Sequence, residues 1–405
     1  MGSELSLNST ILISEPNEAV DFSSTYQIVA TLLLIIVFLT GLLGNLLVIV
    51  VVIRSEEMRT ITNFYLVSLA CSDVLILLSC TLPAIFDSFF YRGQFFLGPV
   101  FCAIFIFLQY LGINTSALCI TAFTVERYIG ICHPIRAQSL CTHHRAKLVI
   151  LSLWVFGVLY HSSWLYLATT FPYRLVDENL TIQTCTYRVE RDEYAYIYMV
   201  DLVLFYILPL AVTCTLYTLI ARTLCHSARG LKMSLTSPNL QEKPETQHLK
   251  KDKLEIRCTV HKGVGVEAAK RVQAARLQVV KMLIVVTVLF AVLWLPYRSW
   301  VVYNSFAAEH KRFYNDWFYL FIKIMAYTNS AMNPILYSAM SKKFRHAFIT
   351  QICISKLFPI ENDTKGSRTI CKSSEHGRNS LRPRSTVLII NDPSELEPSP
   401  TVQNV

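Results

Sequence analysis

The sequence predicts an all-α membrane protein, a seven-transmembrane helix bundle with a short amphipathic cytoplasmic helix after span seven. The first observation is composition: of 405 residues, 53% are hydrophobic and 16% are charged, whereas soluble domains carry about 25% charged residues. The second is pattern, since seven long runs with few charges alternate with polar segments. About 20 apolar residues in a helix cross the ~30 Å hydrocarbon core of a bilayer, so each run predicts one span.

The third run is the best defined. It opens at Cys102, carries no Asp, Glu, Lys or Arg from residue 103 to residue 125, and closes on Glu126-Arg127-Tyr128. The other spans are expected at residues 22–53, 60–86, 148–173, 194–221, 281–303 and 317–340.

The segments outside the spans have distinct compositions. Residues 1–25 are expected to form an extracellular tail, and residues 26–350 the bundle. Residues 227–265 predict a flexible third cytoplasmic loop, and the absence of Gly and Pro from 266 to 295 predicts that span six continues into the cytoplasm as a helix. Residues 341–348 are basic and aromatic, which is typical of a helix on the inner leaflet. Residues 351–405 predict a disordered cytoplasmic tail.

Charge asymmetry predicts the orientation. Residues 1–26 hold four acids and no Lys or Arg, whereas the insert between Arg222 and Lys281 is rich in both. Cytoplasmic segments retain positive charge, so we expect a multi-pass plasma-membrane protein with its N-terminus outside and its C-terminus inside. The basic runs flank apolar spans, which disfavours nucleic-acid binding.

Covalent features follow from this topology. Of the twelve cysteines, only Cys102 and Cys185 fall at positions predicted to be extracellular, so they are expected to form a disulfide. The sequons at Asn8 and Asn179 are also outside and predict glycosylation. Cys353, beside the expected inner-leaflet helix, is a candidate for palmitoylation.

Several motifs occur in a fixed order along the spans. They are Gly44-Asn45, Leu69-Ala70 with Asp73, Glu126-Arg127-Tyr128, Trp154, Pro209 with Tyr217, Trp294-Leu295-Pro296, and Asn333-Pro334-Ile335-Leu336-Tyr337. In this order and spacing they resemble the rhodopsin-like (class A) G-protein-coupled receptors over about residues 26 to 350. The resemblance implies an extracellular ligand pocket and a cytoplasmic face for a heterotrimeric G protein.

A closer resemblance follows from the sequence at 108–114, from Glu126 to Ile129, from His133-Pro134 and from residues 294–306. These are similar to the thyrotropin-releasing hormone receptors, a branch of small-peptide receptors. The resemblance implies coupling to Gq/11 and phospholipase C, with calcium release. The tail residues Ser373, Ser374, Ser380, Ser385 and Thr386 are candidate sites for receptor kinases and hence for arrestin recruitment. The resemblance implies ligand contacts from Tyr110 and Asn114 to a pyroglutamyl ring, from Tyr297 to a histidine, and from Tyr187, Arg191 and Asn304.

One position departs from the resemblance. Where those receptors have an arginine that holds the prolinamide end of the ligand, this chain has Lys323. Lysine is a point charge, whereas arginine is a planar fork that can grip one carbonyl through two bonds. We therefore expect the hormone or a close analogue to activate this chain with weakened affinity. The alternative is a different small amidated peptide.

The residues support a peptide pocket without the resemblance. Ionisable side chains inside a membrane are costly, and each is a functional hypothesis. Gln109, Tyr110 and Asn114 form a polar patch at pocket depth, and Tyr110, Asn114, Arg298 and Lys323, without a strong pocket acid, suit a neutral ligand rich in carbonyls. The alternatives are that Tyr110 and Asn114 are helix contacts, and that Lys323 and Arg298 reach the outer headgroups; the partner of Arg298 in the pocket is expected to be Asp201.

An activation switch is expected below the pocket. Arg127 is predicted to leave Glu126 on activation and to face the G protein. No acid occurs at Ala275-Arg276-Leu277, which predicts a weak inner lock and signalling without ligand. The full set of expected switch residues is Glu126, Arg127, Tyr128, Tyr217, Trp294, Pro296, Asn333, Pro334 and Tyr337.

Asp73 has two interpretations. It is either a hydrogen-bond hub for Ser116, Asn329 and Asn333, or it binds an allosteric sodium ion with their oxygens. No other cofactor is expected.

Other classes fit less well. A retinal protein needs a lysine where the chain has Tyr327, an amine receptor needs an acid where it has Gln109, and no internal repeat suggests a transporter. No histidine cluster or phosphate-binding glycine loop suggests an enzyme.

Overall fold

The computed structural model describes residues 21–175, 180–236 and 252–357. All of them lie in one compact unit, Met1–Leu357. The predicted glycosylation sites Asn8 and Asn179 lie outside the described residues, as do the tail from residue 358 onward and most of the N-terminal tail.

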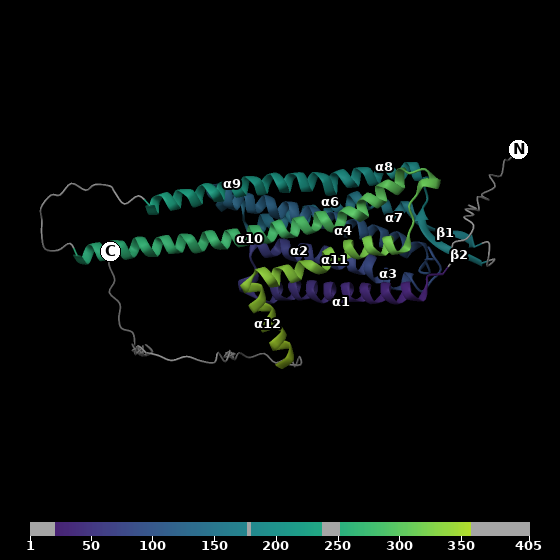
Figure 1. Cartoon of the computed structure of the whole chain (residues 1–405), viewed down its shortest axis with the longest axis horizontal. Coiled ribbons are helices and arrows are strands. Elements are labelled where there is room, and N and C mark those ends of the chain that lie inside the picture. Colours follow the sequence, from purple (N-terminus) through teal and green to yellow (C-terminus); the bar gives the residue numbers. More distant parts are fainter. Residues whose placement is uncertain (1–20, 176–179, 237–251, 358–405) are drawn as a thin grey trace, which may run out of the picture. The chain divides into compact units, whose positions relative to one another are not determined.

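The predicted helical spans are present and lie side by side (Figure 1). Within the part of the chain that the structure describes, six are long and apolar enough to cross a membrane: α1 (Ser24–Arg54), α2 with α3 (Ile61–Asp87), α4 (Gly98–Cys132), α6 with α7 (His143–Leu167), α8 with α9 (Glu193–His226) and the outer part of α10 (Leu277–Phe306). The seventh, α11 (Asp316–Met340), has 25 residues, which is about 37 Å of helix. It is more polar because Lys323, Asn329 and Asn333 fall within it.

Two spans contain a π turn just before a proline. Span two consists of α2 (Ile61–Ile76), η2 (Leu77–Thr81) and α3 (Leu82–Asp87), with Pro83 in the first turn of α3. Span five consists of α8 (Arg191–Leu202), η3 (Val203–Ile207) and α9 (Leu208–Thr236), with Pro209 after the π turn. Proline has no N–H to give the carbonyl four residues earlier, and a π turn is one way in which a helix absorbs this loss.

The carbonyl freed by the proline within α11 is satisfied by a neighbouring helix. Pro334 frees the carbonyl of Ser330, and the Asn45 side chain of α1 donates to that carbonyl at 2.9 Å. Asn45 also donates to Gly41 O at 2.9 Å and is fully buried. A Cβ at Gly44 would lie 2.9 Å from the Pro334 ring, so glycine is needed for α1 to approach α11 this closely.

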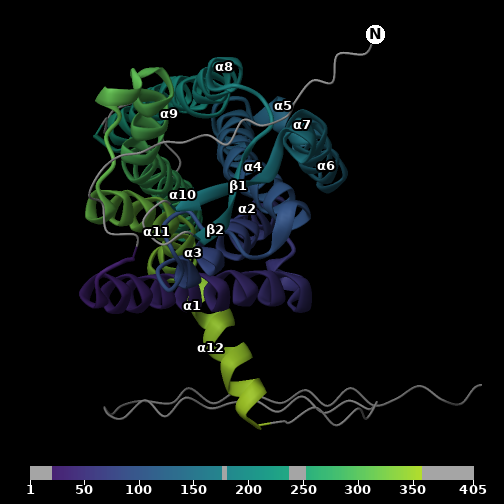
Figure 2. The same cartoon turned by 90° about the vertical axis from the view of Figure 1, so that its right-hand side faces the viewer.

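The outer end of the bundle, defined here as the end that carries the hairpin, differs from the prediction. Span four was expected to continue to residue 173, but α6 (His143–His161) and α7 (Ser163–Leu167) are followed by a strand, β1 (Ala168–Leu175). β1 pairs antiparallel with β2 (Leu180–Tyr187), and the two lie across the ends of the helices (Figure 2). The helical assignment of 168–173 was wrong because the apolar run continues through residues whose partners lie across the hairpin. The predicted Cys102–Cys185 disulfide is confirmed and joins β2 to α4.

The opposite, inner end also extends further than predicted. α9 continues to Thr236, and α10 (Asp252–Phe306) begins well before residue 265, so helix occupies both ends of the expected 227–265 loop. Residues 237–251 lie outside the described residues. Both helices extend past the rest of the bundle in Figure 1. The reason is that the polar sequence there has helix-forming residues, which composition alone assigned to a loop.

Short elements complete the chain. The expected amphipathic helix is α12 (Lys342–Leu357), which turns away from the bundle axis (Figure 1) and packs Phe344 against Tyr337 of α11. The remaining connections contain η1 (Glu56–Met58), α5 (Pro134–Leu140) and η4 (Glu309–Lys311).

Candidate functional site

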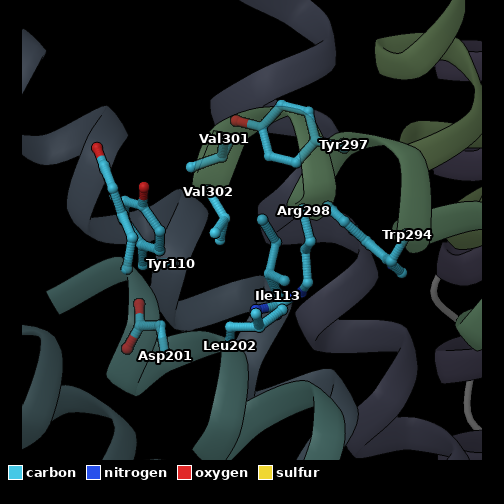
Figure 3. A pocket seen from close by; sticks show the side chains of 10 residues that line it. Tyr110, Ile113, Asp201, Leu202, Trp294, Tyr297, Arg298, Val301 and Val302 are labelled. Carbon is cyan, nitrogen blue, oxygen red and sulfur yellow. The ribbon is translucent and has the colours of Figure 1, made fainter. Parts of the chain in front are cut away.

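A cavity lies among α4, α8 and α10 in the outer half of the bundle (Figure 3). Like most pockets for small ligands, it combines apolar and aromatic side chains with a few polar groups. Its lining residues are Tyr110, Ile113, Tyr198, Asp201, Leu202, Trp294, Tyr297, Arg298, Val301 and Val302.

One wall of the cavity carries a chain of hydrogen bonds between three helices. Arg298 of α10 donates to Asn114 Oδ1 of α4 at 2.9 Å. Asn114 Nδ2 lies 2.8 Å from His161 Nε2 of α6, and His161 Nδ1 lies 2.7 Å from the carbonyl of Gly157. Asn114 and His161 are fully buried, so these bonds satisfy groups that water does not reach.

Two charges face each other at the same wall. The Asp201 carboxylate is 2% exposed, lines the cavity and interacts electrostatically with Arg298. The Arg298 guanidinium carbon lies 5.5 Å from the Tyr206 ring centroid, within the range of a cation–π contact. Tyr160 and Asn114 lie beside the Asp201 carboxylate without a hydrogen bond of good geometry, and Arg298 Nε has no hydrogen-bond partner among the described residues. The pocket wall therefore keeps hydrogen-bonding capacity for a polar ligand.

Aromatic rings form the wall next to the hairpin. Tyr110 stacks on Trp164 with ring centroids 4.7 Å apart. The Tyr198 hydroxyl donates to the Tyr187 hydroxyl of β2 at 2.7 Å. Burial raises the pKa of Tyr187 to about 12, so this phenol is neutral at physiological pH. The hairpin is thus tied to α8 at the rim of the cavity.

A polar cluster lies deeper in the bundle. Asn333 of α11 donates to Asp73 Oδ2 at 2.7 Å, and Asp73 is fully buried. The other Asp73 oxygen and the hydroxyls of Ser116 and Ser330 have no hydrogen-bond partner among the described residues. Ser330 neighbours the carboxylate. These oxygens are the ligands that a hard cation prefers.

The inner end holds an ion pair. Arg127 donates to Glu126 Oε1 at 2.7 Å and to Glu126 Oε2 at 2.6 Å. The Tyr217 hydroxyl of α9 lies 3.0 Å from Thr124 of α4 and 3.0 Å from Thr287 of α10. Three helices that meet at the inner face are therefore held by one phenol, next to a paired arginine.

Comparison with known proteins decides the family. Residues 44–337 match the family model described as "7 transmembrane receptor (rhodopsin family)". The thyrotropin-releasing hormone receptor of Gallus gallus is 42% identical over 341 residues, which is 84% of this chain and 82% of the relative. The Homo sapiens receptor of the same name is 40% identical, covering 87% of this chain and 85% of the relative. The chain belongs to the thyrotropin-releasing hormone receptors of the rhodopsin family. The cholecystokinin receptor type A of Cavia porcellus is a more distant relative, 28% identical over 83% of each chain.

This family assignment confirms the predicted seven-transmembrane fold and the class of receptor. It places the receptor in the plasma membrane as a multi-pass protein with a G protein as partner, in a family of signalling receptors and not of enzymes.

The predicted ligand-binding residues fall into two groups. Tyr110, Tyr297 and Arg298 line the cavity. Asn114 binds Arg298, and Gln109 donates to the Tyr297 hydroxyl at 3.2 Å, so both contact the lining.

The other predicted ligand residues are engaged elsewhere. Arg191 donates to the carbonyl of Ser305 at 3.2 Å. The side chain of Asn304 bonds both backbone groups of Phe313, at 2.9 and 3.1 Å, and so holds the connection between α10 and α11.

Lys323 lies outside the cavity lining. Its ammonium lies 3.6 Å from the Asp87 carboxylate at the outer end of span two and 4.4 Å from the Tyr319 ring centroid. Asp87 was not foreseen as its partner, because the two residues are far apart in sequence.

The site also includes residues that sequence reasoning missed. Tyr198 and Leu202 of α8 line the cavity and carry no motif. His161 was not predicted to be part of the site either. Its spacing of four from Gly157 was the available signal, since residues i and i+4 lie one above the other on a helix.

Proposed function

We propose that this chain is a cell-surface receptor activated by thyrotropin-releasing hormone or a close analogue, which signals through Gq/11, phospholipase C and calcium. The observation that carries the proposal is the identity of 40–42% to receptors of that name over more than four-fifths of the chain. The orientation follows the charge pattern, with the N-terminus and the hairpin outside. Arrestin and receptor kinases are further partners on the cytoplasmic side.

The chemistry of the cavity supports a small, uncharged peptide. Asn114, Tyr297 and Gln109 offer amide and hydroxyl groups, and Arg298 offers guanidinium donors, which together suit carbonyl groups. Asp201 balances the charge of Arg298, so the polar wall has no net charge to attract a charged ligand. A blocked peptide such as a pyroglutamyl amide has this character.

Lys323 bears on ligand affinity. Its pairing with Asp87 gives the ammonium an alternative partner to a ligand carbonyl. We expect weakened hormone affinity, and Lys323→Arg should strengthen the response. If Lys323→Arg left the hormone response unchanged, this account of the lysine would be wrong.

On the inner side, activation separates Arg127 from Glu126 and exposes the arginine to the G protein. Tyr217, Tyr337 and Trp294 move with the helices that carry them. The fully buried Trp294 lines the cavity, so a ligand there contacts the same helix that closes the inner face.

A sodium ion fits the cluster around Asp73. Asp73 would supply the charge, and Ser116, Asn329, Asn333 and Ser330 the neutral oxygens. Sodium bound there favours the inactive state, so replacing sodium with N-methylglucamine should raise agonist affinity. The same exchange should have no effect in Asp73→Asn.

The test of the function is a calcium-release screen in cells that express the full chain. The panel contains thyrotropin-releasing hormone, its free acid and other amidated and pyroglutamyl peptides, with surface expression measured through an N-terminal epitope. We expect the hormone to release calcium and Asn114→Ala to reduce its potency at equal surface expression. A response only to an unrelated amidated peptide would overturn the hormone assignment in favour of the alternative ligand.

A further inference from the structure

The side chain of His161 occupies a fixed place behind the polar wall of the cavity. It is fully buried at the end of α6, and it does not line the cavity. Its ring is surrounded by three aromatic rings, with centroid distances of 4.9 Å to Tyr160, 5.4 Å to Phe205 and 6.4 Å to Tyr110. The Tyr110 ring is nearly parallel to it, at 6°. The imidazole plane therefore has little freedom to turn.

The partners of His161 define its tautomer. Nδ1 lies 2.7 Å from the carbonyl oxygen of Gly157, which can only accept, so Nδ1 carries the proton. In a neutral imidazole, Nε2 then has a lone pair, and it accepts from Asn114 Nδ2 at 2.8 Å. This matches the orientation of Asn114, because the amide nitrogen faces an acceptor.

The other end of Asn114 gives the same orientation independently. Arg298 can only donate, so the Asn114 atom that lies 2.9 Å from its Nη2 must be Oδ1. The Asp201 carboxylate also neighbours the Asn114 amide, which again suits the nitrogen. If the amide turned over, its oxygen would lose the Arg298 bond and two sets of donors would face each other.

We propose that His161 is a positioning residue of the ligand site, which holds the Asn114 amide with its oxygen toward Arg298 and the cavity. It acts through Asn114 and does not touch the ligand. The inference rests on the proposed function insofar as a peptide binds this cavity. Without the imidazole, the Asn114 amide loses its partner on the nitrogen side and keeps only the contacts with Arg298 and Asp201, so the acceptor that fixes the Arg298 guanidinium is held less firmly.

Three substitutions separate positioning from simple packing. The amide oxygen of His161→Gln reaches the place of Nε2 and can accept from Asn114. His161→Asn reaches only the place of Nδ1 and keeps the Gly157 bond alone. His161→Phe keeps the ring and loses both bonds. The matched control is His144→Phe, the same change at the exposed start of the same helix.

Binding of labelled thyrotropin-releasing hormone to the full chain in membranes is the first readout. An orphaned buried hydrogen-bonding group should weaken binding by roughly tenfold, so His161→Asn and His161→Phe should raise Kd by about that factor. His161→Gln should stay within about threefold of the unmodified receptor, and His144→Phe should match it. In an Asn114→Ala background, His161→Phe should have no further effect. Equal loss in all three His161 variants, or full additivity with Asn114→Ala, would overturn the proposal.

A ligand-free measurement separates this proposal from the proposed function. In purified receptor with ¹⁵N-labelled histidine, the signal that disappears in His161→Gln belongs to His161 and should report a proton on Nδ1. That signal should shift in Asn114→Ala. A proton on Nε2, or no shift, would overturn the positioning role whether or not the hormone binds. Absence of hormone binding with the expected histidine signal would instead count against the hormone assignment.

Discussion

Replacement of Glu126 by glutamine tests the inner ion pair most directly. Arg127 donates to both carboxylate oxygens, at 2.7 and 2.6 Å. The side chains of Arg127 and Glu126 are only 23% and 9% exposed, so water weakens the pair less than at an open surface. Hydrogen bonds to charged groups contribute about 1.5–3 kcal/mol. Glu126→Gln keeps an acceptor but removes the charge, which should cost the paired state about 2 kcal/mol.

This loss of stability in the paired state should raise signalling without ligand. About 2 kcal/mol corresponds to a shift of roughly 30-fold in the equilibrium between the paired state and the state in which Arg127 is free. A receptor that is about 1% active without ligand would become about one-quarter active. Because the chain has no acid at residues 275–277, the unmodified receptor should already show measurable basal activity.

The assay is inositol-phosphate accumulation without agonist, normalised to surface expression. Arg127→Ala is the matched control. The double variant Glu126→Gln/Arg127→Ala should be silent, because the freed group that contacts the G protein is absent. An unchanged basal level in Glu126→Gln at equal surface expression would refute the reasoning, and so would a high basal level in the double variant.

Three further predictions concern the outer ion pair and the packing of α1. Asp87→Asn should raise hormone potency by about fivefold, because an exposed ion pair contributes about 1 kcal/mol and its loss frees Lys323 for the ligand. Dose–response curves measure this potency. An equal gain in potency in Lys323→Ala would contradict the prediction. Asn45→Ala should lower the melting temperature of purified receptor by orphaning the Ser330 carbonyl, a cost of about 1–3 kcal/mol, and unchanged thermal unfolding would count against the role of that bond. Gly44→Leu should abolish surface expression, since even a Cβ there lies 2.9 Å from a proline ring; normal expression by flow cytometry would show that α1 can move aside.

The helices could be predicted from the sequence because the membrane imposes a local rule. A span must be long, apolar and internally hydrogen-bonded, so residues 103–125 can be predicted as a span from their composition alone, without knowledge of which elements they contact. The hairpin does not obey such a rule. Thr170 pairs with Cys185, and that pairing depends on where the chain returns after β1. The apolar residues 168–173 were therefore predicted to continue the helix of span four.

Side-chain partners set the same limit in the site. Helix spacing places Tyr110 and Asn114 on one face of α4, and both reach the pocket wall. Nothing local indicates that Asn304 uses both ends of its amide on Phe313, or that Lys323 faces Asp87. These partners come from other elements of the fold, so the sequence alone does not show which polar side chains already have a partner, and the ligand roles of Asn304 and Lys323 stay predictions.

The two ends of the receptor are joined by α10. Arg298 and Trp294 of this helix line the cavity, and Thr287, about 16 Å from Arg298 along the axis, bonds Tyr217 at the inner end. The partner helix α4 carries Asn114 at the outer end and Arg127 at the inner end. A ligand that competes for the Asn114–Arg298 bond therefore acts on the same pair of helices that Tyr217 holds together beside Arg127. Because α10 is one continuous helix, its displacement from α4 at the cavity also moves its inner end, where Thr287 bonds Tyr217 of α9.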